Sequence, residues 1–344
     1  MTTVHSDVSE LVVRADALER DGRRRAAIDV LCEANRLQRD IEIERRLVRL
    51  RHDAFAEIDR SQALATWPPT IPDHDPPDEL GPLTLSSPRE LTLDTLRHGI
   101  YRYGSVHVRG AIPPDRVARL VECIDRAFDG YDAHAAGAPA SETTPWFEPF
   151  NAPEVAEPGI RRRWTRDASG IQVADSPRAL FELLDTLEAV GFRDLVADHL
   201  GEPAVLSMAK CVLRRVSLDT VPSWHQDGAF LGDDLRAVNV WITLTDCGRD
   251  APGLDLVGRR FDHVVETGTE GAAFDTFAGQ AVVERVAPGA IVRPTFAAGD
   301  ILIFDELLLH RSAVDPSMTR ERHAIETWFF APSRYPEELV PLVF

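Results

Sequence analysis

The sequence predicts an α+β fold in which helices buttress one face of an antiparallel β sandwich or barrel. Two observations predict it. Up to residue 200 the dominant pattern is helical, with apolar residues recurring every three or four positions. After Gly201, short β-branched or aromatic segments alternate with turn residues, which is typical of a sandwich or barrel. Helices first and strands second indicate that the helices cover one sheet.

Residues 1–62 are expected to form a helical extension. Three apolar stripes follow one another between Leu11 and Phe55, and Asp21-Gly22 marks a turn between the first two. The segment ALERDGRRRAAIDVLCEANRL resembles one tetratricopeptide-type helical hairpin. A single repeat of this kind cannot bury its own apolar face, so we expect the extension to pack on the main domain or on a second subunit.

A proline-rich stretch, residues 63–90, separates the extension from the main domain, residues 91–344. Proline is excluded from helix interiors and central strands, so this stretch is expected to be a linker or a strap across the surface. The main domain should then begin with a short helix, an alternating strand in GSVHVRG, and a helix from Pro114 to Phe128. An irregular loop over residues 130–170, either a lid or disordered, should precede a helix pair.

Six later segments have the composition and alternation of strands. They are AVLSMAKCVLRRV, AVNVWITLTD, AAFDTF, AIVRPTF, DILIFDELLLH and RHAIETWFFA. In the loop before them, Trp146 and Phe147 are expected to be lid residues.

The overall charge excludes some partners. The chain of 344 residues has a formal net charge of −18, which should repel nucleic acid and anionic lipid. No apolar run approaches the ~20 residues needed to cross a bilayer, and no secretory signal is recognisable. The four cysteines are scattered without a CxxC pair, which is typical of reduced thiols in a cytoplasmic enzyme. We therefore expect a cytoplasmic protein that binds neither nucleic acid nor membrane.

The segment Trp224-His225-Gln226-Asp227 places two ligand-type side chains at positions i and i+2. On an extended strand these side chains point to the same face, so His225 and Asp227 can converge on one ion. A second histidine, His310, stands at the end of the predicted strand DILIFDELLLH. Two imidazoles and one carboxylate hold iron(II) on one face and leave the opposite face open. The open positions suit a bidentate 2-oxo acid and dioxygen.

Arg322 is the candidate partner for the distant carboxylate of 2-oxoglutarate. It lies on the predicted strand RHAIETWF, and a guanidinium can bind a carboxylate bidentately. Arg320 competes for this role, but Arg322 continues directly into the alternating strand. His263 and His323 have no partner at metal spacing and are not expected to be ligands.

These segments resemble the phytanoyl-CoA dioxygenase family of iron(II)- and 2-oxoglutarate-dependent oxygenases. The matching features are HVRGAIPPDRVARLVECID, SWHQD, VNVWITLTD, GDILIFDELLLHRS and RHAIETWF. The resemblance implies a double-stranded β-helix, or jelly roll, with the metal between its two sheets. It also implies His225, Asp227 and His310 as the catalytic metal ligands.

The resemblance further implies that Arg322 anchors 2-oxoglutarate and that Ser312 and Trp241 line its pocket. Ala324 stands where other oxygenases pair the arginine with a serine, so Ser312 is expected to supply that hydroxyl. Related halogenases replace the metal carboxylate with a small residue, so Asp227 favours hydroxylation or another oxidation over halogenation. We therefore expect a hydroxylase of a small organic substrate, a bacterial metabolite or natural-product intermediate.

Several alternatives stay open at this point. One is a cupin-like metalloenzyme that does not use 2-oxoglutarate; another is a catalytically silent binding module that works through its N-terminal helices. These helices could also support a homodimer. Lys210 could reach a substrate carboxylate or the co-substrate, or lie on the surface, because strand alternation alone does not fix its facing. Arg161 to Arg163, with Trp164, could clamp an anionic substrate or form a solvated face; Arg259 and Arg260 have the same status.

Overall fold

The computed structural model describes residues 2–61, 67–69, 79–152, 158–232 and 235–344. Its strands are β1 Leu83–Leu85, β2 Ser105–Val108, β3 Gly170–Gln172, β4 Val205–Val216, β5 Ala237–Thr243, β6 Gly253–Val257, β7 Ile291–Val292, β8 Ile301–Phe304, β9 His310–Ala313, β10 Arg322–Phe330 and β11 Pro341–Val343. Its α-helices are α1 Thr2–Arg20, α2 Arg24–Leu37, α3 Ile41–Asp53, α4 Leu93–His98, α5 Pro114–Ala135, α6 Ala140–Thr143, α7 Pro158–Asp167, α8 Pro177–Ala189, α9 Phe192–Leu200, α10 Gly228–Leu231 and α11 Gln280–Val286. Short helical turns cover Ala54–Glu57, Pro88–Glu90, Gly99–Tyr103, Val173–Asp175 and Pro332–Arg334.

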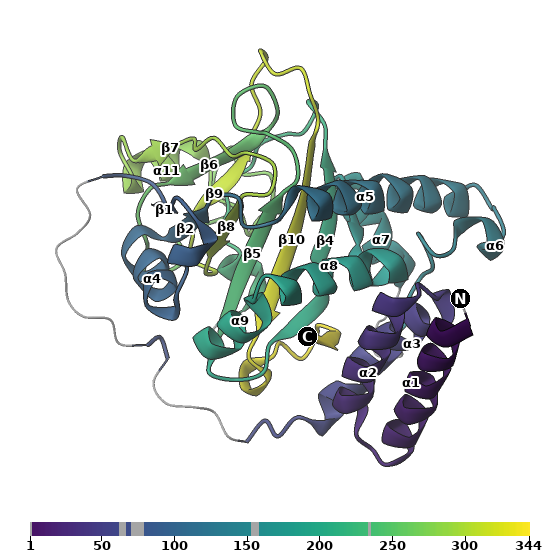
Figure 1. The fold of residues 1–344 in the computed structure, drawn as a ribbon. Helices are drawn as coiled ribbons and strands as arrows, with labels where there is room; N and C mark the ends of the chain where they lie inside the picture. The colour runs from purple at the N-terminus through teal and green to yellow at the C-terminus, as the bar shows by residue number, and fades with distance from the viewer. Residues whose placement is uncertain (1, 62–66, 70–78, 153–157, 233–234) are drawn as a thin grey trace.

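Two sheets of different size make up the strand-rich part. The large sheet has the order β1-β2-β8-β5-β10-β4-β11, with β3 added beside β4, and the small sheet has the order β7-β6-β9. All pairs are antiparallel except β1 with β2. Helices α5, α8 and α9 cross one face of the large sheet (Figure 1). This is the predicted α+β arrangement, with helices on one side of a sheet.

Strand alternation divides the interior into two cores. On β5, Val238, Val240 and Ile242 belong to the core on the helix side, whereas Ala237 and Trp241 belong to a second core that also contains residues of β6. Because successive side chains on a strand point to opposite faces, one strand supplies both cores. The second core lies between the sheets and forms the floor on which the site is built.

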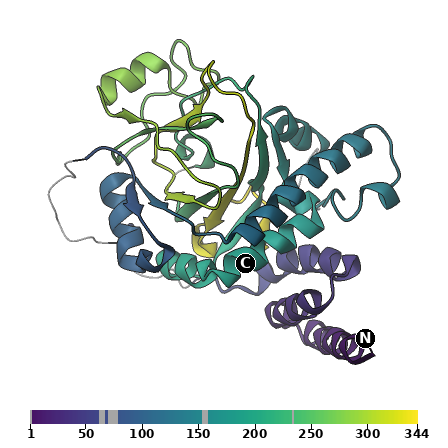
Figure 2. The ribbon, with the colours of Figure 1, turned by 45° about the horizontal axis from the view of Figure 1, so that its top comes forward.

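Helices α5 and α8 provide the cover over the large sheet (Figure 2). Proline at the first position of each helix fits there, since that residue has no intrahelical donor role. Leu120 and Ile124 of α5 join Leu183 and Leu184 of α8 in the helix-side core. The helices thus cover one face of the large sheet, and the opposite face remains available to line the cavity.

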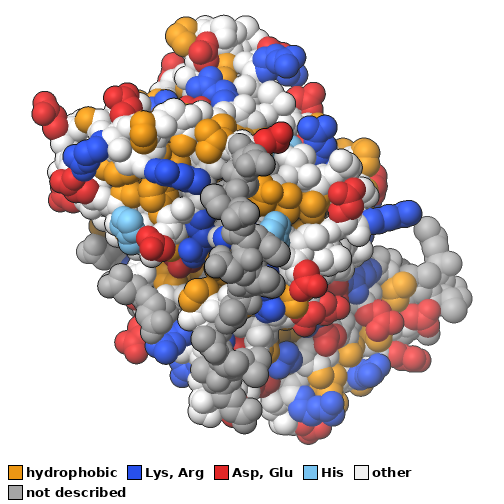
Figure 3. Space-filling view, turned by 90° about the vertical axis from the view of Figure 1, so that its left-hand side faces the viewer, with side chains coloured by type: hydrophobic (Ala, Val, Ile, Leu, Met, Phe, Trp, Pro, Cys, Tyr) orange, Lys and Arg blue, Asp and Glu red, His pale blue; other side chains and the backbone are white. Residues whose placement is uncertain are grey.

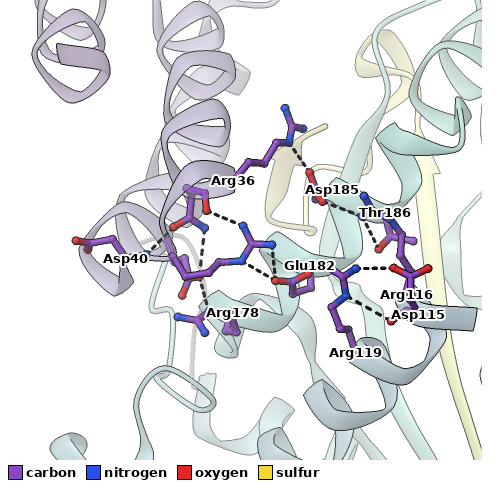
Figure 4. A network of polar contacts seen from close by, with 12 residues as sticks. Arg36, Asp40, Asp115, Arg116, Arg119, Arg178, Glu182, Asp185 and Thr186 are labelled. Carbon is purple, nitrogen blue, oxygen red and sulfur yellow. Dashed lines mark hydrogen bonds and ion pairs between the residues drawn. The ribbon is translucent and has the colours of Figure 1, made fainter. Parts of the chain in front are cut away.

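The N-terminal helices pack on the main domain, one of the two arrangements that their apolar stripes predict. Leu31 and Leu47 share a core cluster with Phe181 of α8 and Val343 of β11. Helix α3 begins at the N-cap Asp40, which accepts hydrogen bonds from two backbone N–H groups of the first turn. Polar contacts also link α2, α3, α8 and α5 (Figure 4). The division of the chain into domains stays a prediction.

Several predicted elements differ in the structure. The stretch 130–170 contains the end of α5 and helices α6 and α7, and Phe147 is fully buried in the helix-side core, so it is not a lid residue. AAFDTF forms no strand, and DILIFDELLLH is two strands separated by a turn. Part of the proline-rich stretch lies outside the described residues, but Leu83–Leu85 forms β1 beside β2.

The surface carries mixed charge. On the face shown in Figure 3, acidic and basic side chains are interspersed, and no broad basic area is visible there. Among the described residues, no helix is both long and apolar enough to cross a membrane. The four cysteines are free and buried.

Candidate active site

Three side chains predicted as metal ligands lie together. His225, Asp227 and His310 each offer a ligand atom, and these atoms lie within 4.8 Å of one another. The Nε2 atom of His310 is 3.9 Å from Oδ2 of Asp227, and the two imidazole centroids are 4.4 Å apart. These separations leave room for one ion in contact with all three.

The backbone brings the two histidines together through a local β-bridge. His225 and His310 exchange two backbone hydrogen bonds of 3.0 Å each, and His310 pairs with Leu256 at the start of β9. His310 therefore begins a strand, whereas the sequence predicted it at a strand end. Asp227 has helical backbone angles as the N-cap of α10, so the argument from an extended strand is wrong for this residue.

Hydrogen bonds fix which ring nitrogens face the site. Nδ1 of His225 lies 2.9 Å from the carbonyl oxygen of Ser223, and Nδ1 of His310 lies 3.0 Å from that of Leu308. A carbonyl only accepts, so each Nδ1 must carry the proton and each Nε2 keeps its lone pair. Burial, together with the neighbouring His310, lowers the pKa of His225 to about 4, and Asp227 opposes this shift. Both conditions favour neutral imidazole ligands.

Gln226 supports the motif from behind. Its amide nitrogen donates to the carbonyls of Leu307 at 2.7 Å and His263 at 3.0 Å, and its oxygen accepts from the N–H of Val265 at 2.7 Å. The side chain is 2% exposed. It ties the motif to the turn before His310.

Arg322 is buried without a carboxylate partner. It is 2% exposed, and among the described residues its only hydrogen bonds go from Nη1 to the carbonyls of Gly253 at 2.6 Å and Pro252 at 3.2 Å. Its Nε has no partner in the part of the chain described, and the guanidinium lies 5.3 Å from the ring centroid of Trp241. Burial lowers the pKa of Arg322. A buried cation of this kind requires a compensating anion.

One cavity of about 600 Å³ contains the predicted residues. The metal trio, Arg322, Ser312 and Trp241 all line it, whereas Arg320 is exposed beside Asp250. Arg322 bonds to Gly253, which pairs with Ala313, three residues along β9 from His310. That spacing is about 10 Å of strand. Part of this distance is spanned by the side chains of Arg322 and His310, and the remainder fits a five-carbon dicarboxylate.

The basic residues whose roles were open fall into two groups. Arg162 pairs with buried Asp175, so it is not free to clamp a ligand, and Arg163 is exposed. Trp164, in contrast, is 71% exposed and lines the cavity mouth, and Lys210 also lines the cavity.

The remaining basic candidates have structural partners. Arg260 pairs with Asp305, and Arg259 donates to the carbonyl of Val286. His263 lies beside Asp262, and the Nε2 atom of His323 is 2.9 Å from Asp125. None of these residues lines the cavity.

Sequence reasoning missed several residues of the cavity. Asn239 lies two positions before Trp241 on β5, and its Oδ1 is buried without a partner among the described residues. Glu326 lies four positions after Arg322 on β10. Strand alternation could have identified both. Phe277, whose ring stacks on His225 with centroids 4.9 Å apart, lies in an irregular loop that gives no such signal.

Several solved structures are similar to this chain. EctD from S. alaskensis, with 2-oxoglutarate and 5-hydroxyectoine, is 18% identical over 75% of this chain and 85% of that one, with a TM-score of 0.50. SnoK, a non-heme alpha ketoglutarate dependent carbocyclase from nogalamycin biosynthesis, is 14% identical over 75% and 99%, with a TM-score of 0.47. AviO1 from Streptomyces viridochromogenes Tue57 is 19% identical over 72% and 99%, with a TM-score of 0.43. The similarity to EctD supports the predicted jelly-roll fold.

Sequence comparison identifies the family. No curated protein matches the chain. The sequence model of phytanoyl-CoA dioxygenase (PhyH), however, matches residues 100–323, a range that includes the three candidate ligands and Arg322. Because this match covers well over half of the chain, the protein belongs to the phytanoyl-CoA dioxygenase family of iron(II)- and 2-oxoglutarate-dependent oxygenases.

Proposed function

We propose that the protein hydroxylates a small organic molecule, a bacterial metabolite or a natural-product intermediate, at the cavity between its sheets. The observation that carries this proposal is the combination of a three-ligand metal site with a buried arginine that lacks an anion. The metal site suits iron(II), and the buried arginine suits the far carboxylate of 2-oxoglutarate. EctD was solved with 2-oxoglutarate and 5-hydroxyectoine, in agreement with this function.

The donor set fits iron(II). His225 and His310 would each contribute an Nε2 lone pair, and Asp227 would contribute one carboxylate oxygen. Two histidines and one carboxylate on one side of the ion are the arrangement of non-haem iron(II) oxygenases. The carbonyls that accept from each Nδ1 would hold the rings in the required orientation before the metal arrives. Asp227 occupies the position that a halogenase leaves open, which favours hydroxylation.

The co-substrate would lie between Arg322 and the metal ligands. The guanidinium of Arg322 would bind its far carboxylate, and the orphan Nε would gain an acceptor. Ser312, on the strand between, would offer a hydroxyl to the same carboxylate. Trp241 would exclude water from this end of the cavity, and its ring would stabilise the guanidinium by a cation–π contact.

Bound iron would supply the oxidising chemistry, driven by oxidative decarboxylation of 2-oxoglutarate to succinate. The residues of this chain bind, orient and exclude water. Phe230 and Phe277 lie beside His225, with ring centroids at 6.0 Å and 4.9 Å, so the substrate side of the site is apolar. A substrate held there would present one C–H bond to the metal side and would be shielded from solvent.

Succinate formation tests the proposal. Purified protein with iron(II), 2-oxoglutarate and air should release succinate, and omission of iron or of 2-oxoglutarate should abolish it. His225→Ala and Asp227→Ala should each reduce the rate by at least about 100-fold, because either change removes a metal ligand. His263→Ala is the matched control, since this exposed histidine lies outside the cavity. Retention of activity in either ligand variant would falsify the assignment of these residues.

The rival functions now have weaker support. A cupin-like enzyme that does not use 2-oxoglutarate leaves Arg322 uncompensated, and a silent binding module leaves the ligand set unexplained. A cytoplasmic location remains part of this proposal, supported by four unpaired cysteines. A homodimer through the N-terminal helices also remains a proposal, supported only by apolar side chains such as Val13, which is 65% exposed on α1.

A further inference from the structure

Lys210, the only lysine of the chain, lies on the substrate side of the cavity. It belongs to β4, on which Lys210, Val212 and Arg214 line the cavity in alternation. Its ammonium is 4.2 Å from the ring centroid of Phe230, and that ring is 6.0 Å from the ring of His225. Only one aromatic ring therefore separates the ammonium from a candidate metal ligand.

No protein carboxylate is reserved for Lys210. Among the described residues it forms no hydrogen bond and no ion pair. Burial lowers the pKa of Lys210, and the carboxylates that oppose this shift are Asp227, which is a candidate metal ligand, and Glu326. Glu326 is already held by Arg214 through two hydrogen bonds of 3.0 Å and 2.9 Å. An ammonium group in a partly dry cavity without its own anion favours a ligand that brings one.

The ammonium lies too far from Arg322 to share its ligand. Arg322 pairs across the sheet with Val216, and Lys210 lies six residues earlier on the same strand. Six residues of strand span about 20 Å. Arg322 is at one end of the cavity and Lys210 is at the other, with Asp227 near the latter. The two cations would therefore bind two different molecules.

The walls between Lys210 and the solvent are aromatic. Phe277 stacks on His225, and Phe274 contacts Phe277 with ring centroids 5.2 Å apart. Phe274 is 67% exposed and Trp164 is 71% exposed, and both line the cavity. Large exposed aromatic side chains at the mouth of a pocket indicate contact with an apolar ligand. The whole cavity, including its co-substrate side, measures about 600 Å³, which suits 2-oxoglutarate together with a small substrate.

We propose that the substrate is an amphipathic organic acid whose carboxylate pairs with Lys210 and whose apolar, ring-bearing body lies on Phe230 and Phe277. This inference rests on the proposed function, since it names the substrate class of the same cavity. Lys210 would thus determine specificity, holding the acid so that a carbon of its body faces the metal ligands.

Matched pairs of acids and amides test this inference. The probes are benzoate, phenylacetate and 3-phenylpropanoate, each compared with its primary amide, which has the same shape without the charge; phenyl phosphate tests another anion. Dissociation constants are measured by calorimetry under nitrogen on protein loaded with iron(II) and 2-oxoglutarate. In the wild type, at least one acid should bind about tenfold or more tightly than its amide, as expected for a charge-assisted hydrogen bond.

Variants identify the responsible side chain. Lys210→Met keeps a flexible side chain on Phe230 but removes the charge. The acid-to-amide ratio, which is the affinity for the acid divided by the affinity for its amide, should therefore fall below about 3, a value expected once the ion pair is lost. Lys210→Arg should retain most of the ratio. Arg163→Met, which removes an exposed positive charge from α7, should leave the ratio unchanged. Unchanged 2-oxoglutarate affinity in Lys210→Met would show that the site is intact.

Several outcomes overturn the inference. Equal binding of acids and amides, no measurable binding of any probe, or a ratio that survives Lys210→Met would each exclude Lys210 as a carboxylate partner. Tighter binding of phenyl phosphate than of every acid would overturn the assignment to carboxylates. The proposed function is tested separately, because binding of 2-oxoglutarate is measured before the probe is added. The acid-to-amide ratio can also be measured with iron(II) alone, so failure of one proposal does not hide the other.

Discussion

At the scale of single residues, Arg322 shows how a buried charge reports an absent ligand. Its two hydrogen bonds to carbonyl oxygens satisfy only part of the guanidinium, and its Nε is orphaned within the described part of the chain. A neutral carbonyl offers far less compensation than a carboxylate does. The side chain is therefore arranged for a dianionic molecule that completes its coordination.

Arg322→Met should raise the KM for 2-oxoglutarate. Loss of a bidentate, charge-assisted contact corresponds to about 1.5–3 kcal/mol, or about 10- to 150-fold in affinity. Iron binding should be unaffected, because none of the three candidate metal ligands lies on β10. Steady-state kinetics and iron titration check this, with exposed Arg320→Met as the control. If Arg320→Met weakened 2-oxoglutarate binding and Arg322→Met did not, the two arginines would have to exchange roles.

Single residues could be predicted where several of them together form an uncommon set of side-chain types. His225, Asp227, His310 and Arg322 could be selected from the sequence because their types and order match one kind of metal site. The backbone conformation at Asp227 could not be predicted in this way. The helical turn of α10 depends on Gly228, whose N–H donates to the carbonyl of Glu306. Such a contact between distant segments leaves no local pattern.

At the scale of elements, the contact between α3 and α8 shows how the N-terminal helices are held. Glu44 of α3 is 1% exposed, accepts a hydrogen bond from Asn35 at 3.2 Å, and pairs with Arg178 of α8. Burial raises the pKa of Glu44, and Arg178 opposes the shift. The carboxylate depends on this arginine, because one amide does not replace a positive charge.

Arg178→Met should therefore destabilise the protein by about 3–5 kcal/mol, since it leaves a buried carboxylate unpaired. Arg119→Met is the matched control: its ion pair with Asp115 is exposed, and its loss should change stability by less than about 1 kcal/mol. Urea unfolding measures both. The double variant Arg178→Met/Glu44→Leu should recover much of the loss; a double variant as unstable as Arg178→Met would mean that packing, not charge, explains the effect.

Elements were predicted best where one periodicity runs without interruption. The stripes of α2, α3, α5 and α8 and the alternation of β4, β5 and β10 are all of this kind. The pattern predicts DILIFDELLLH as one strand because the break at Asp305–Leu309 contains neither glycine nor proline. The same limit applies to α7, whose run of arginines shows no apolar face.

At the scale of the whole molecule, the helices and the strands have different roles. One face of the large sheet is sealed by α5, α8 and α9, and its other face meets the small sheet around the cavity. The sequence order, helices before strands, made this general arrangement predictable. The pairing of β2 with β8, which joins the beginning of the main domain to its end, was not, because such long-range pairing has no counterpart in local pattern.

Acid stability depends on a buried histidine far from the cavity. His199 of α9 is 1% exposed, packs against Trp67 and Tyr101, and has no hydrogen-bond partner for either ring nitrogen among the described residues. Burial, and to a lesser degree the nearby Arg97, lowers the pKa of His199 to about 3. The unfolded chain therefore binds a proton at this ring at a higher pH than the folded protein does.

The consequence is a loss of stability on acidification. Between the unfolded pKa of about 6.5 and the folded value near 3, the unfolded state holds more protons, so the free energy of unfolding falls as the pH falls. At pH 5 the contribution of His199 should be about 2 kcal/mol. His199→Leu removes the titration, so its decrease in stability from pH 7.5 to 5 should be smaller than that of the wild type by about this amount, whatever its stability at pH 7.5. Urea unfolding at both pH values measures the difference, and His263→Leu, at an exposed position, should keep the wild-type decrease. An identical decrease in wild type and His199→Leu would mean that other groups control the acid response.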